Sequence, residues 1–510
     1  MLRRLKNQRA ERDTMHDGTL LAAVDLGSNS FRLEIGRFEH GLIRRIEYLK
    51  ETVRQGSGLD GERNLTPEAM QRGWDCLARF AERLKGFPAD RVRAVATQTL
   101  REARNRDAFL QQGSAILGHP IEVVSGPEEA RLIYQGVAHL LPQSDERRLV
   151  VDIGGRSTEL ILGHAFCADA VASFRVGSVA WSNRYFADGA FTAESFRTAE
   201  IAAKAVLDEA LNTYRPQAWD VAYGSSGTAG AVGEMLAAAG GTPGLITRDG
   251  LDWLQEQLLR ARSADKVRLE GLKEDRRAVI GGGISVLRAV FDLLEIRTMQ
   301  VAQGALRQGV LYDLLDRELP ADDVRSSTVR GLMERFQVDA QHAGRVARTA
   351  ALLHAQLHPV AQPGAPDHGD RELVWAAQLH EIGCIVSHGD HHHHGAYILE
   401  HTDAAGFSVS ELHHLSLLVQ GHRGKVRKLE ANLDNPRLAR ELACLRMAVA
   451  LCHARRDPDL EGIALACEGH RFVARARPGW AAAFPQSAHL LREEGVAWQR
   501  TSWEFAAELP

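Results

Sequence analysis

Over the first 320 residues, short apolar runs alternate with longer stretches in which hydrophobic residues recur every three or four positions. The runs at residues 21–24 and 149–151 predict buried strands, and so do shorter runs at 92–96 and 121–124. Helices are predicted after Thr66 and Ser125, because each hydroxyl can cap a helix with a proline and an acid in its first turn. Alternating strands and helices indicate an α/β fold.

Two of these runs end in similar turns. Asp25 is followed by Leu-Gly-Ser-Asn-Ser, and Asp152 is followed by Ile-Gly-Gly-Arg-Ser-Thr. An Asp at a strand end, followed by glycine and small hydroxyl residues, presents a carboxylate beside accessible backbone N–H groups, which suits a metal-bound phosphate. Two copies predict duplicated lobes that face each other across a cleft. The alternative for each turn is a polar hairpin without a ligand.

Helical periodicity replaces the alternating pattern after Pro320 and continues to about Arg455, and strand-like segments with aromatic residues follow. The predicted organisation is a disordered leader, two α/β lobes, a helical domain and a small α+β domain. The predicted bounds of these parts are 1–18, 19–140, 141–319, 320–458 and 459–510.

The composition is that of an ordinary globular protein, with 45% hydrophobic and 25% charged residues among 510. The net charge of −4 argues against a generally basic nucleic-acid binder, so no nucleic-acid partner is predicted. No apolar run reaches the ~20 residues that span a bilayer, so no integral membrane segment is predicted. The six cysteines form no C-x-x-C pair. Reduced thiols indicate a cytoplasmic location, with the periphery of the inner membrane as an alternative.

Two groups of residues outside the turns are candidates for phosphate chemistry. Glu128 and Glu129 open a predicted helix, where the helix dipole favours acids, so capping is the ordinary interpretation. The alternative is a catalytic carboxylate that takes a proton from water, and at most one of the two would face the cleft. Arg101 shares a spacing of four with Thr97 and Asn105, and it would face phosphate if one helix contains all three.

A second acid accompanies the Asp152 turn. Glu159 lies on the same strand face as Ser157, and Asp152 and Glu159 are therefore candidate Mg²⁺ ligands. Gly227 and Thr228 lie at a predicted helix start and offer N–H groups to an anion, although the lysine of a P-loop is missing.

Histidines are dense between His380 and His422. A metal site must be considered, because imidazole is the commonest transition-metal ligand. The stretch contains no H-E-x-x-H motif and no cysteine pair, so structural or surface histidines are the prediction.

Taken in order, the motifs resemble the exopolyphosphatase and guanosine pentaphosphate phosphohydrolase family. The resemblance covers roughly residues 20–510. It implies two actin-like (ribonuclease H-like) lobes of the ATPase superfamily, followed by a helical HD-like domain and a small α+β domain. The segments that carry it are 25–31, 96–105, 125–134, 152–155, 226–228 and 304–307.

The resemblance also implies a role for each candidate residue. Glu129 matches the catalytic base, and Arg101 matches an arginine that meets the terminal phosphate. Asp25, Asp152 and Glu159 match acids around Mg²⁺. The implied phosphate-lining residues are Ser28, Asn29, Ser30, Gly154, Gly155, Ser157, Gly227 and Thr228. Mg²⁺ is the implied cofactor, with a monovalent cation such as K⁺ as a further one, and a homodimer is the implied assembly.

This chain departs from the family pattern in places. Arg156 stands where a small residue is common, and its side chain would either add a phosphate contact or point away. His342 and the pair His380-Glu381 resemble a degenerate HD phosphohydrolase site, for which a structural role or a polyphosphate channel is expected. The candidate basic residues of that channel are Arg325, Arg330, Arg423, Lys425, Arg427 and Lys428.

The resemblance implies hydrolysis of a phosphoric anhydride. The favoured expectation is an exopolyphosphatase that releases terminal orthophosphate processively from inorganic polyphosphate. The alternative is a guanosine pentaphosphate (pppGpp) 5′-phosphohydrolase that yields ppGpp, since the motifs do not separate the two substrates. More remote alternatives are a sugar or acetate kinase of the same superfamily and a non-catalytic sensor of polyphosphate or an alarmone.

Overall fold

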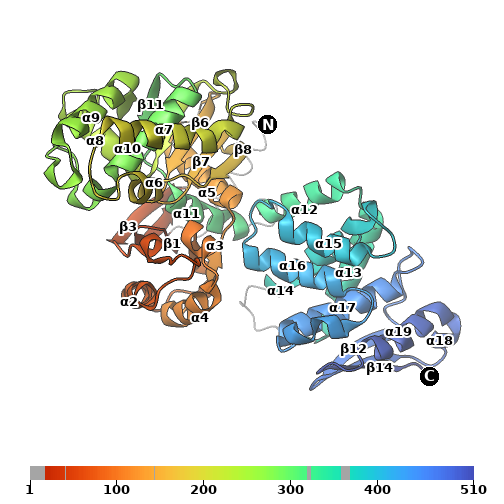
Figure 1. The fold of residues 1–510 in the computed structure, drawn as a ribbon. Coiled ribbons are helices and arrows are strands. Elements are labelled where there is room, and N and C mark those ends of the chain that lie inside the picture. Colours follow the sequence, from red (N-terminus) through yellow and green to blue (C-terminus); the bar gives the residue numbers. More distant parts are fainter. Residues whose placement is uncertain (1–17, 41, 143, 319–322, 358–367) are drawn as a thin grey trace. The chain divides into compact units, whose positions relative to one another are not determined.

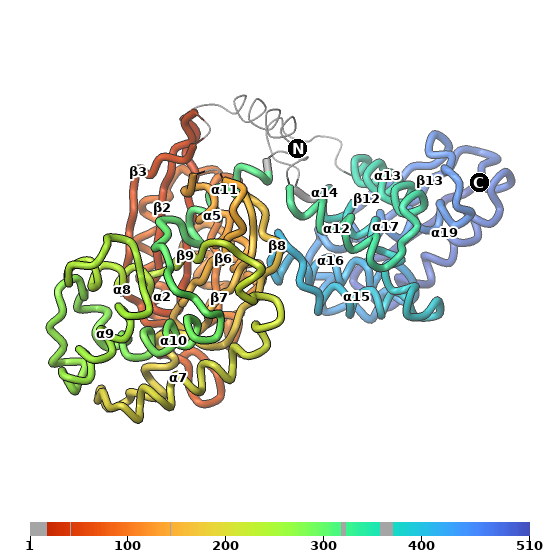
Figure 2. The backbone as a smooth tube through the Cα atoms, turned by 90° about the horizontal axis from the view of Figure 1, so that it is seen from above, coloured from red at the N-terminus to blue at the C-terminus, as the bar shows by residue number. Residues whose placement is uncertain are grey.

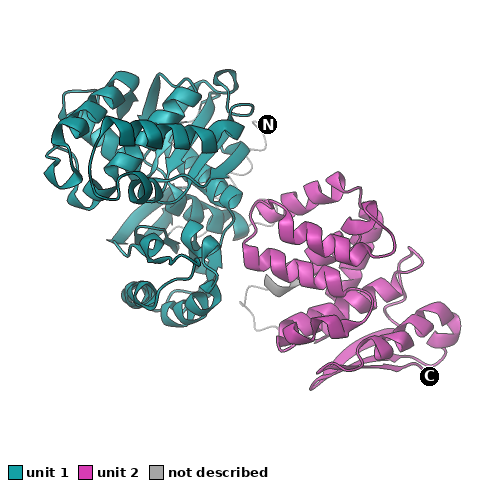
Figure 3. Ribbon diagram, viewed as in Figure 1, with its two compact units in different colours: residues 1–322 teal, residues 323–510 magenta. Residues whose placement is uncertain are grey.

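The computed structural model describes residues 18–40, 42–142, 144–318, 323–357 and 368–510. The chain forms two compact units, residues 1–322 and 323–510, which are coloured separately in Figure 3. The first unit contains the two sheets that the apolar runs predict. The predicted leader, residues 1–18, lies outside the described residues except for Gly18.

A five-stranded sheet with the order β3-β2-β1-β4-β5 forms the first lobe. Its strands are β1 Leu20–Leu26, β2 Phe31–Glu39, β3 Leu42–Glu51, β4 Val92–Ala96 and β5 Ile121–Val123. β1 pairs antiparallel with β2 and parallel with β4. It lies at the centre of the sheet and is buried on both faces from Leu21 to Leu26, which explains its unbroken apolar run.

A six-stranded sheet with the order β10-β11-β9-β6-β7-β8 forms the second lobe. Its strands are β6 Arg147–Ile153, β7 Thr158–His164, β8 Cys167–Phe174, β9 Val221–Ser225, β10 Leu245–Thr247 and β11 Thr298–Val301. β6 repeats the environment of β1, since it pairs antiparallel with the next strand, β7, and parallel with β9. The two similar turns therefore occupy equivalent places in two similar sheets.

Helices cover both sheets of this unit (Figure 1). They are α2 Pro67–Leu84, α3 Gln98–Glu102, α4 Arg106–Leu117, α5 Gly126–Leu140, α6 Ser178–Tyr185, α7 Ala193–Leu207, α8 Ser226–Ala238, α9 Arg248–Ala261, α10 Ile280–Leu293 and α11 Leu306–Glu318. The short 3-10 helix η1 spans Gln55–Gly58. Although α11 comes last in this unit, it packs side by side with α5, as Figure 2 shows. A buried cluster that includes Val137, Val150 and Val310 joins this helix pair to strands of both lobes.

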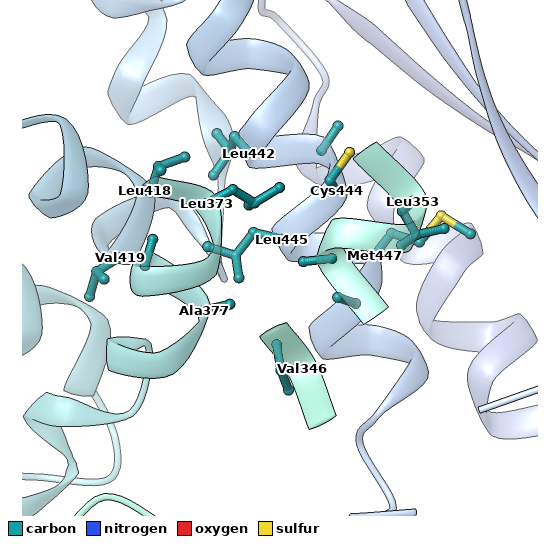
Figure 4. Packing of buried hydrophobic residues seen from close by; sticks show 14 of the residues in the cluster. Val346, Leu353, Leu373, Ala377, Leu418, Val419, Leu442, Cys444, Leu445 and Met447 are labelled. Atoms are coloured by element: carbon teal, nitrogen blue, oxygen red, sulfur yellow. The ribbon is translucent and has the colours of Figure 1, made fainter. Parts of the chain in front are cut away.

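The second unit consists of helices followed by a three-stranded sheet with the order β12-β13-β14. Its main elements are α12 Val324–Arg335, α13 Ala340–Leu357, α14 His368–Leu379, α15 His391–His401, α16 Val409–Gly421, α17 Pro436–Leu451, β12 Ile463–Glu468, β13 Arg471–Ala476, α18 Trp480–Ala483, α19 Pro485–Ala497 and β14 Glu504–Glu508. Helices and sheet share one hydrophobic core, and Figure 4 shows its helical part around Leu373, Leu445 and Met447. The sheet therefore packs on the helices rather than around a core of its own.

Arg325 does not suit the channel role suggested for it. Its buried guanidinium pairs with Asp323 at 2.9 Å and with Glu411 at 2.6 Å, and it lies over the Trp375 ring. The Arg325 guanidinium is therefore neutralised inside the second unit, where it links α12 to α16. No helix in the part of the chain that the structure describes is long and apolar enough to cross a membrane.

Candidate active site

A cavity of about 430 Å³ opens between the two lobes of the first unit, at the turns that follow β1 and β6. Ten of the predicted site residues line it: Asp25, Ser28, Asn29, Ser30, Glu129, Asp152, Gly154, Gly155, Ser157 and Gly227. The other three, Arg101, Glu159 and Thr228, are not among the described residues of its wall. Residues separated by up to 202 positions, from Asp25 to Gly227, are thus brought together at one site.

The two turns touch each other. A side chain built on Gly155 would place its Cβ 3.2 Å from the Ser28 Cβ and 3.3 Å from Val179. The Ser28 hydroxyl accepts a hydrogen bond from Thr99 at 2.8 Å, and the Ser28 carbonyl accepts one from the Gly56 N–H at 2.7 Å. Glycine at position 155 therefore allows the close approach of the two turns, and the neighbouring bonds hold the first turn in place.

The two hairpins differ in the residue that faces the Asp. Asp25 lies opposite Arg32 in the β1–β2 register, and the Arg32 guanidinium is 3.0 Å from its carboxylate. In the β6–β7 register, Asp152 lies opposite Glu159. One acid is therefore paired with a cation and the other with a second acid, although the sequence motifs are similar.

This arrangement concentrates buried negative charge near Asp152. Burial, helped by the charges of Glu129 and Asp25, raises the pKa of Asp152 to about 7, against a hydrogen bond from Ser225 and the charge of Arg32. Burial beside Glu129 and Asp152 also raises the pKa of Glu159 well above its ordinary value. The Glu159 carboxylate accepts a hydrogen bond from Ser173 at 2.7 Å and does not line the cavity wall.

These acids fit a bound Mg²⁺ ion. The cation prefers oxygen ligands, takes one or two carboxylates and keeps several waters. Asp152 lines the cavity, and the residue opposite it in the strand register is an acid rather than a cation, so it is best placed to hold the ion. Asp25 also lines the cavity, but it shares its carboxylate with Arg32 and with Arg307, 3.6 Å away. Glu159 lies opposite Asp152 but is not among the described residues of the wall, so it would influence the ion electrostatically without binding it.

Glu129 reaches the cavity from the start of α5. The Ser125 hydroxyl caps this helix by accepting the Glu128 N–H at 3.2 Å, as the sequence predicts. Glu129 lines the cavity and is 8% exposed, whereas Glu128 is bonded to Arg131 at 2.8 Å. Only one of the two acids faces the cleft, which confirms that expectation. Arg131 also pairs with Asp313 of α11 at 2.5 Å, so this network fixes the position of α5.

Arg101 holds Glu129 rather than lining the cavity. Its guanidinium lies 2.7 Å from the Glu129 carboxylate and donates to the Val124 carbonyl at 2.9 Å. Thr97, Arg101 and Asn105 do not share a helical face, because the single helix on which that expectation depended does not form. α3 ends at Glu102, and Asn105 precedes α4 and bonds through its side-chain amide to the backbone of Leu65.

Thr228 also differs from its expected place. Its hydroxyl donates to the Ile153 carbonyl at 2.9 Å, which ties α8 to the end of β6. Gly227 does line the cavity, and a Cβ at that position would overlap the Arg276 guanidinium. The glycine therefore makes room for an arginine from a distant segment.

Five basic residues of the cavity wall were not predicted from the sequence: Arg32, Lys50, Lys273, Arg276 and Arg307. Burial and the nearby Arg32 lower the pKa of Arg276, which shows that positive charge is concentrated there. Arg32 could have been found from the sequence, because the predicted hairpin places it opposite Asp25. Arg276 has none, because tertiary packing alone brings it to the Gly227 turn.

Arg156 connects the two lobes. Its guanidinium lies 2.8 Å from Glu102 at the end of α3 and donates to the Gly56 carbonyl at 3.2 Å. Of the two alternatives for this residue, pointing away from the phosphate turn is the one that the structure shows. The side chain bridges the Asp152 turn and the first lobe.

Two actin-like lobes with paired Asp-Gly turns, a buried carboxylate and many cations define an enzyme that acts on phosphate groups. Comparisons support this class. A model of the Ppx/GppA phosphatase family matches residues 35–318, and one of Ppx/GppA phosphatase, domain III, matches residues 324–493. The chain belongs to the Ppx/GppA phosphatase family, whose members are hydrolases of phosphoric anhydrides.

Relatives of known name cover nearly the whole chain. Proteins named guanosine-5′-triphosphate,3′-diphosphate pyrophosphatase are 40% identical in Vibrio vulnificus (strain YJ016) and 39% identical in Vibrio cholerae (strain O395). Each alignment covers 96% of this chain and 98% of the relative. Among solved structures, an exopolyphosphatase from Cytophaga hutchinsonii is similar with a TM-score of 0.53 at 25% identity. That similarity covers 59% of this chain and 98% of the other.

Proposed function

We propose that this protein hydrolyses the terminal 5′ phosphate of pppGpp to yield ppGpp and orthophosphate. The relatives that align over 96% of the chain carry the name of that activity, whereas the exopolyphosphatase similarity covers 59% of it at lower identity. This evidence favours the alternative over the initial expectation of a polyphosphate substrate. The structural observation that carries the proposal is a cavity of about 430 Å³ with five cations on its wall.

The size and charge of the cavity suit a nucleotide with many phosphates. Ligand sites of small molecules measure ~300–1,000 Å³, so this cavity can enclose a nucleotide-sized molecule. Residues of both turns line the cavity, where their polar groups can meet the reacting phosphate. Arg32, Arg276 and Lys273 provide further positive charge on the wall. Guanidinium groups bind phosphate with two parallel hydrogen bonds, which favours a ligand with phosphates beyond the reacting one.

Glu129 is the proposed general base. Burial raises its pKa, while the adjacent Arg101 guanidinium opposes that shift and keeps the carboxylate available. A base with a raised pKa accepts a proton from water more readily near neutral pH. Glu129 would take the proton of a water that attacks the terminal phosphorus, and the P–O bond to the β-phosphate would break. Mg²⁺, when bound by Asp152 and Asp25, would neutralise charge on the phosphate oxygens.

A substrate comparison tests this proposal. The purified protein is assayed for orthophosphate release from pppGpp, GTP and long-chain polyphosphate at equal Mg²⁺. We expect kcat/KM to be highest for pppGpp. A much higher value for polyphosphate would support the exopolyphosphatase function instead. Phosphate transfer to an added sugar or acetate without orthophosphate release would favour a kinase, and binding without turnover would favour a sensor.

Homodimer formation and the use of a monovalent cation such as K⁺ are also proposed from the family resemblance. Light scattering of the purified protein tests the first. Replacing K⁺ by a bulky organic cation at constant ionic strength tests the second.

A further inference from the structure

The second unit contains a cluster of buried histidines that the proposed hydrolysis does not use. His342 on α13, His380 after α14, His391 on α15 and His422 after α16 are between 2% and 7% exposed. Glu381 lies beside them, with its carboxylate 4.0 Å from His342 Nε2. We refer to these five residues as the imidazole cluster. Four helical segments meet there.

The nitrogen atoms of the cluster face one another at short range. His391 Nε2 lies 3.2 Å from His422 Nε2. His380 lies between this pair and His342, with ring centroids 5.3 Å from His422 and 5.6 Å from His342. Potential ligand atoms of His342, His380 and Glu381 lie within 4.8 Å of one another.

Backbone carbonyls orient two of the rings. His380 Nδ1 lies 2.7 Å from the Ala377 carbonyl, and His422 Nδ1 lies 2.6 Å from the Val419 carbonyl. A carbonyl only accepts hydrogen bonds, so each Nδ1 carries the proton and each Nε2 keeps its lone pair. Histidines that bind metals are commonly held in this way through the other nitrogen.

His391 and Glu381 are held in a similar way. His391 Nδ1 lies 3.1 Å from the His388 carbonyl and can donate its proton there, which leaves Nε2 directed at His422. Arg455 donates to Glu381 at 3.0 Å and thereby holds its carboxylate.

One polar atom of the cluster lacks a partner. His342 Nδ1 is buried without a hydrogen bond, although buried polar atoms are usually satisfied.

We propose that the imidazole cluster binds a divalent first-row transition-metal ion such as Zn²⁺. Imidazole nitrogen suits Zn²⁺, Ni²⁺ and Cu²⁺, whereas Mg²⁺ prefers oxygen ligands. Two imidazoles bound to one tetrahedral ion at about 2.0–2.1 Å lie about 3.3 Å apart, close to the His391–His422 separation of 3.2 Å. The ion would connect the helical segments of the second unit, independently of the hydrolysis proposed above.

Metal binding by the full-length protein tests this proposal. Protein treated with EDTA and freed of chelator is loaded with Zn²⁺ or Co²⁺ in excess Mg²⁺, and retained metal is quantified after desalting. His422→Gln and His380→Gln are expected to weaken Zn²⁺ binding more than about 10-fold, since even loss of an outer-shell partner has an effect of that size. Zn²⁺ should also raise the Tm of the wild type more than that of either variant.

A matched control separates the cluster from neighbouring histidines. His394 continues the same run on α15 but is partly exposed, and it lies outside the neighbouring group of possible ligands Asp390, His392 and His393, so His394→Gln should retain metal like the wild type. Loss of metal in this control, with retention in the two cluster variants, would overturn the proposal. Failure of the wild type to retain Zn²⁺ would overturn it as well.

A spectroscopic measurement on the wild type does not depend on how the variants fold. Zinc X-ray absorption is expected to show imidazole nitrogens at about 2.0–2.1 Å. A spectrum fitted by oxygen ligands alone would contradict the proposal.

Discussion

The Arg101 guanidinium lies 2.7 Å from the carboxylate of Glu129, and both side chains are largely buried. Burial raises the pKa of Glu129, and the Arg101 charge lowers it. Arg101 therefore has two effects: it positions the proposed base, and it opposes the rise in the pKa of that base. The Val124 carbonyl and Gln98 hold the same guanidinium, so its orientation is set before substrate binds.

Removal of Arg101 should shift the pH dependence of catalysis. In Arg101→Met, the pKa of Glu129 rises further because the cation that opposes burial is lost. We expect the acid limb of the kcat/KM profile to move to higher pH, with a loss of about 10-fold or more at pH 7 and partial recovery at pH 9. Arg104→Met, an exposed arginine three residues away, is the control. An equal loss at all pH values would show that Arg101 does not tune the base.

Asp152 should make the stability of the Mg²⁺-free protein depend on pH. Its folded pKa of about 7 exceeds the ordinary value near 4, so its contribution to stability is full below about pH 4 and is lost as pH rises through 7. If Asp152 acts alone, the loss is on the order of 4 kcal/mol. Thermal unfolding should therefore show a larger Mg²⁺-induced rise in Tm at pH 8 than at pH 6.

The Asp152→Asn variant provides the test of that assignment. It should be more stable than the wild type at pH 8 without Mg²⁺, and Mg²⁺ should raise its Tm much less. A Mg²⁺ shift as large as that of the wild type would mean that other residues hold the ion.

Arg276 should contribute to substrate binding rather than to the chemical step. It lines the cavity beside Gly227 of the second lobe, whereas Glu129 reaches the cavity from α5 of the first lobe. A hydrogen bond to a charged group contributes ~1.5–3 kcal/mol, so Arg276→Met should raise KM for pppGpp about 10- to 100-fold with kcat nearly unchanged. Arg277→Met is the matched control, because Arg277 pairs with Glu274 and is not among the described cavity residues. A fall in kcat alone would contradict this role.

Arg156 and Glu102 should behave as one unit. Their ion pair, at 2.8 Å, links the second phosphate turn to the first lobe. Arg156→Ala and Glu102→Ala should each lower kcat/KM and Tm, and the double variant should be little worse than either. A double-mutant cycle should give a coupling energy of ~0.5–3 kcal/mol. Additive losses would show that the two residues act separately.

The sequence predicted those parts of the site that depend on local chain geometry. The apolar strands that end at Asp25 and Asp152, and the cap of α5 at Ser125, follow from short-range patterns. Local geometry predicted that at most one of Glu128 and Glu129 faces the cleft, and the family resemblance singled out Glu129, which does line the cavity. Local patterns carry such information because strand alternation and helix capping involve neighbouring residues.

Long-range packing determined the parts that could not be predicted. Arg276 and Arg307 reach the cavity from segments more than 240 residues beyond the first turn, and no local pattern encodes that approach. Asn105, at the start of α4, bonds to the backbone of Leu65, which lies 40 residues earlier, and no local pattern encodes that contact. The contrast between the pairs Asp25–Arg32 and Asp152–Glu159 required the strand register.

The most direct test of the central claim is the rate of orthophosphate release from pppGpp by Glu129→Gln. The substitution keeps the size of the side chain and removes the proton acceptor. Loss of general-base catalysis should lower kcat about 10²- to 10⁴-fold, while binding of pppGpp is retained. A kcat close to that of the wild type would contradict the assignment of Glu129 as the base.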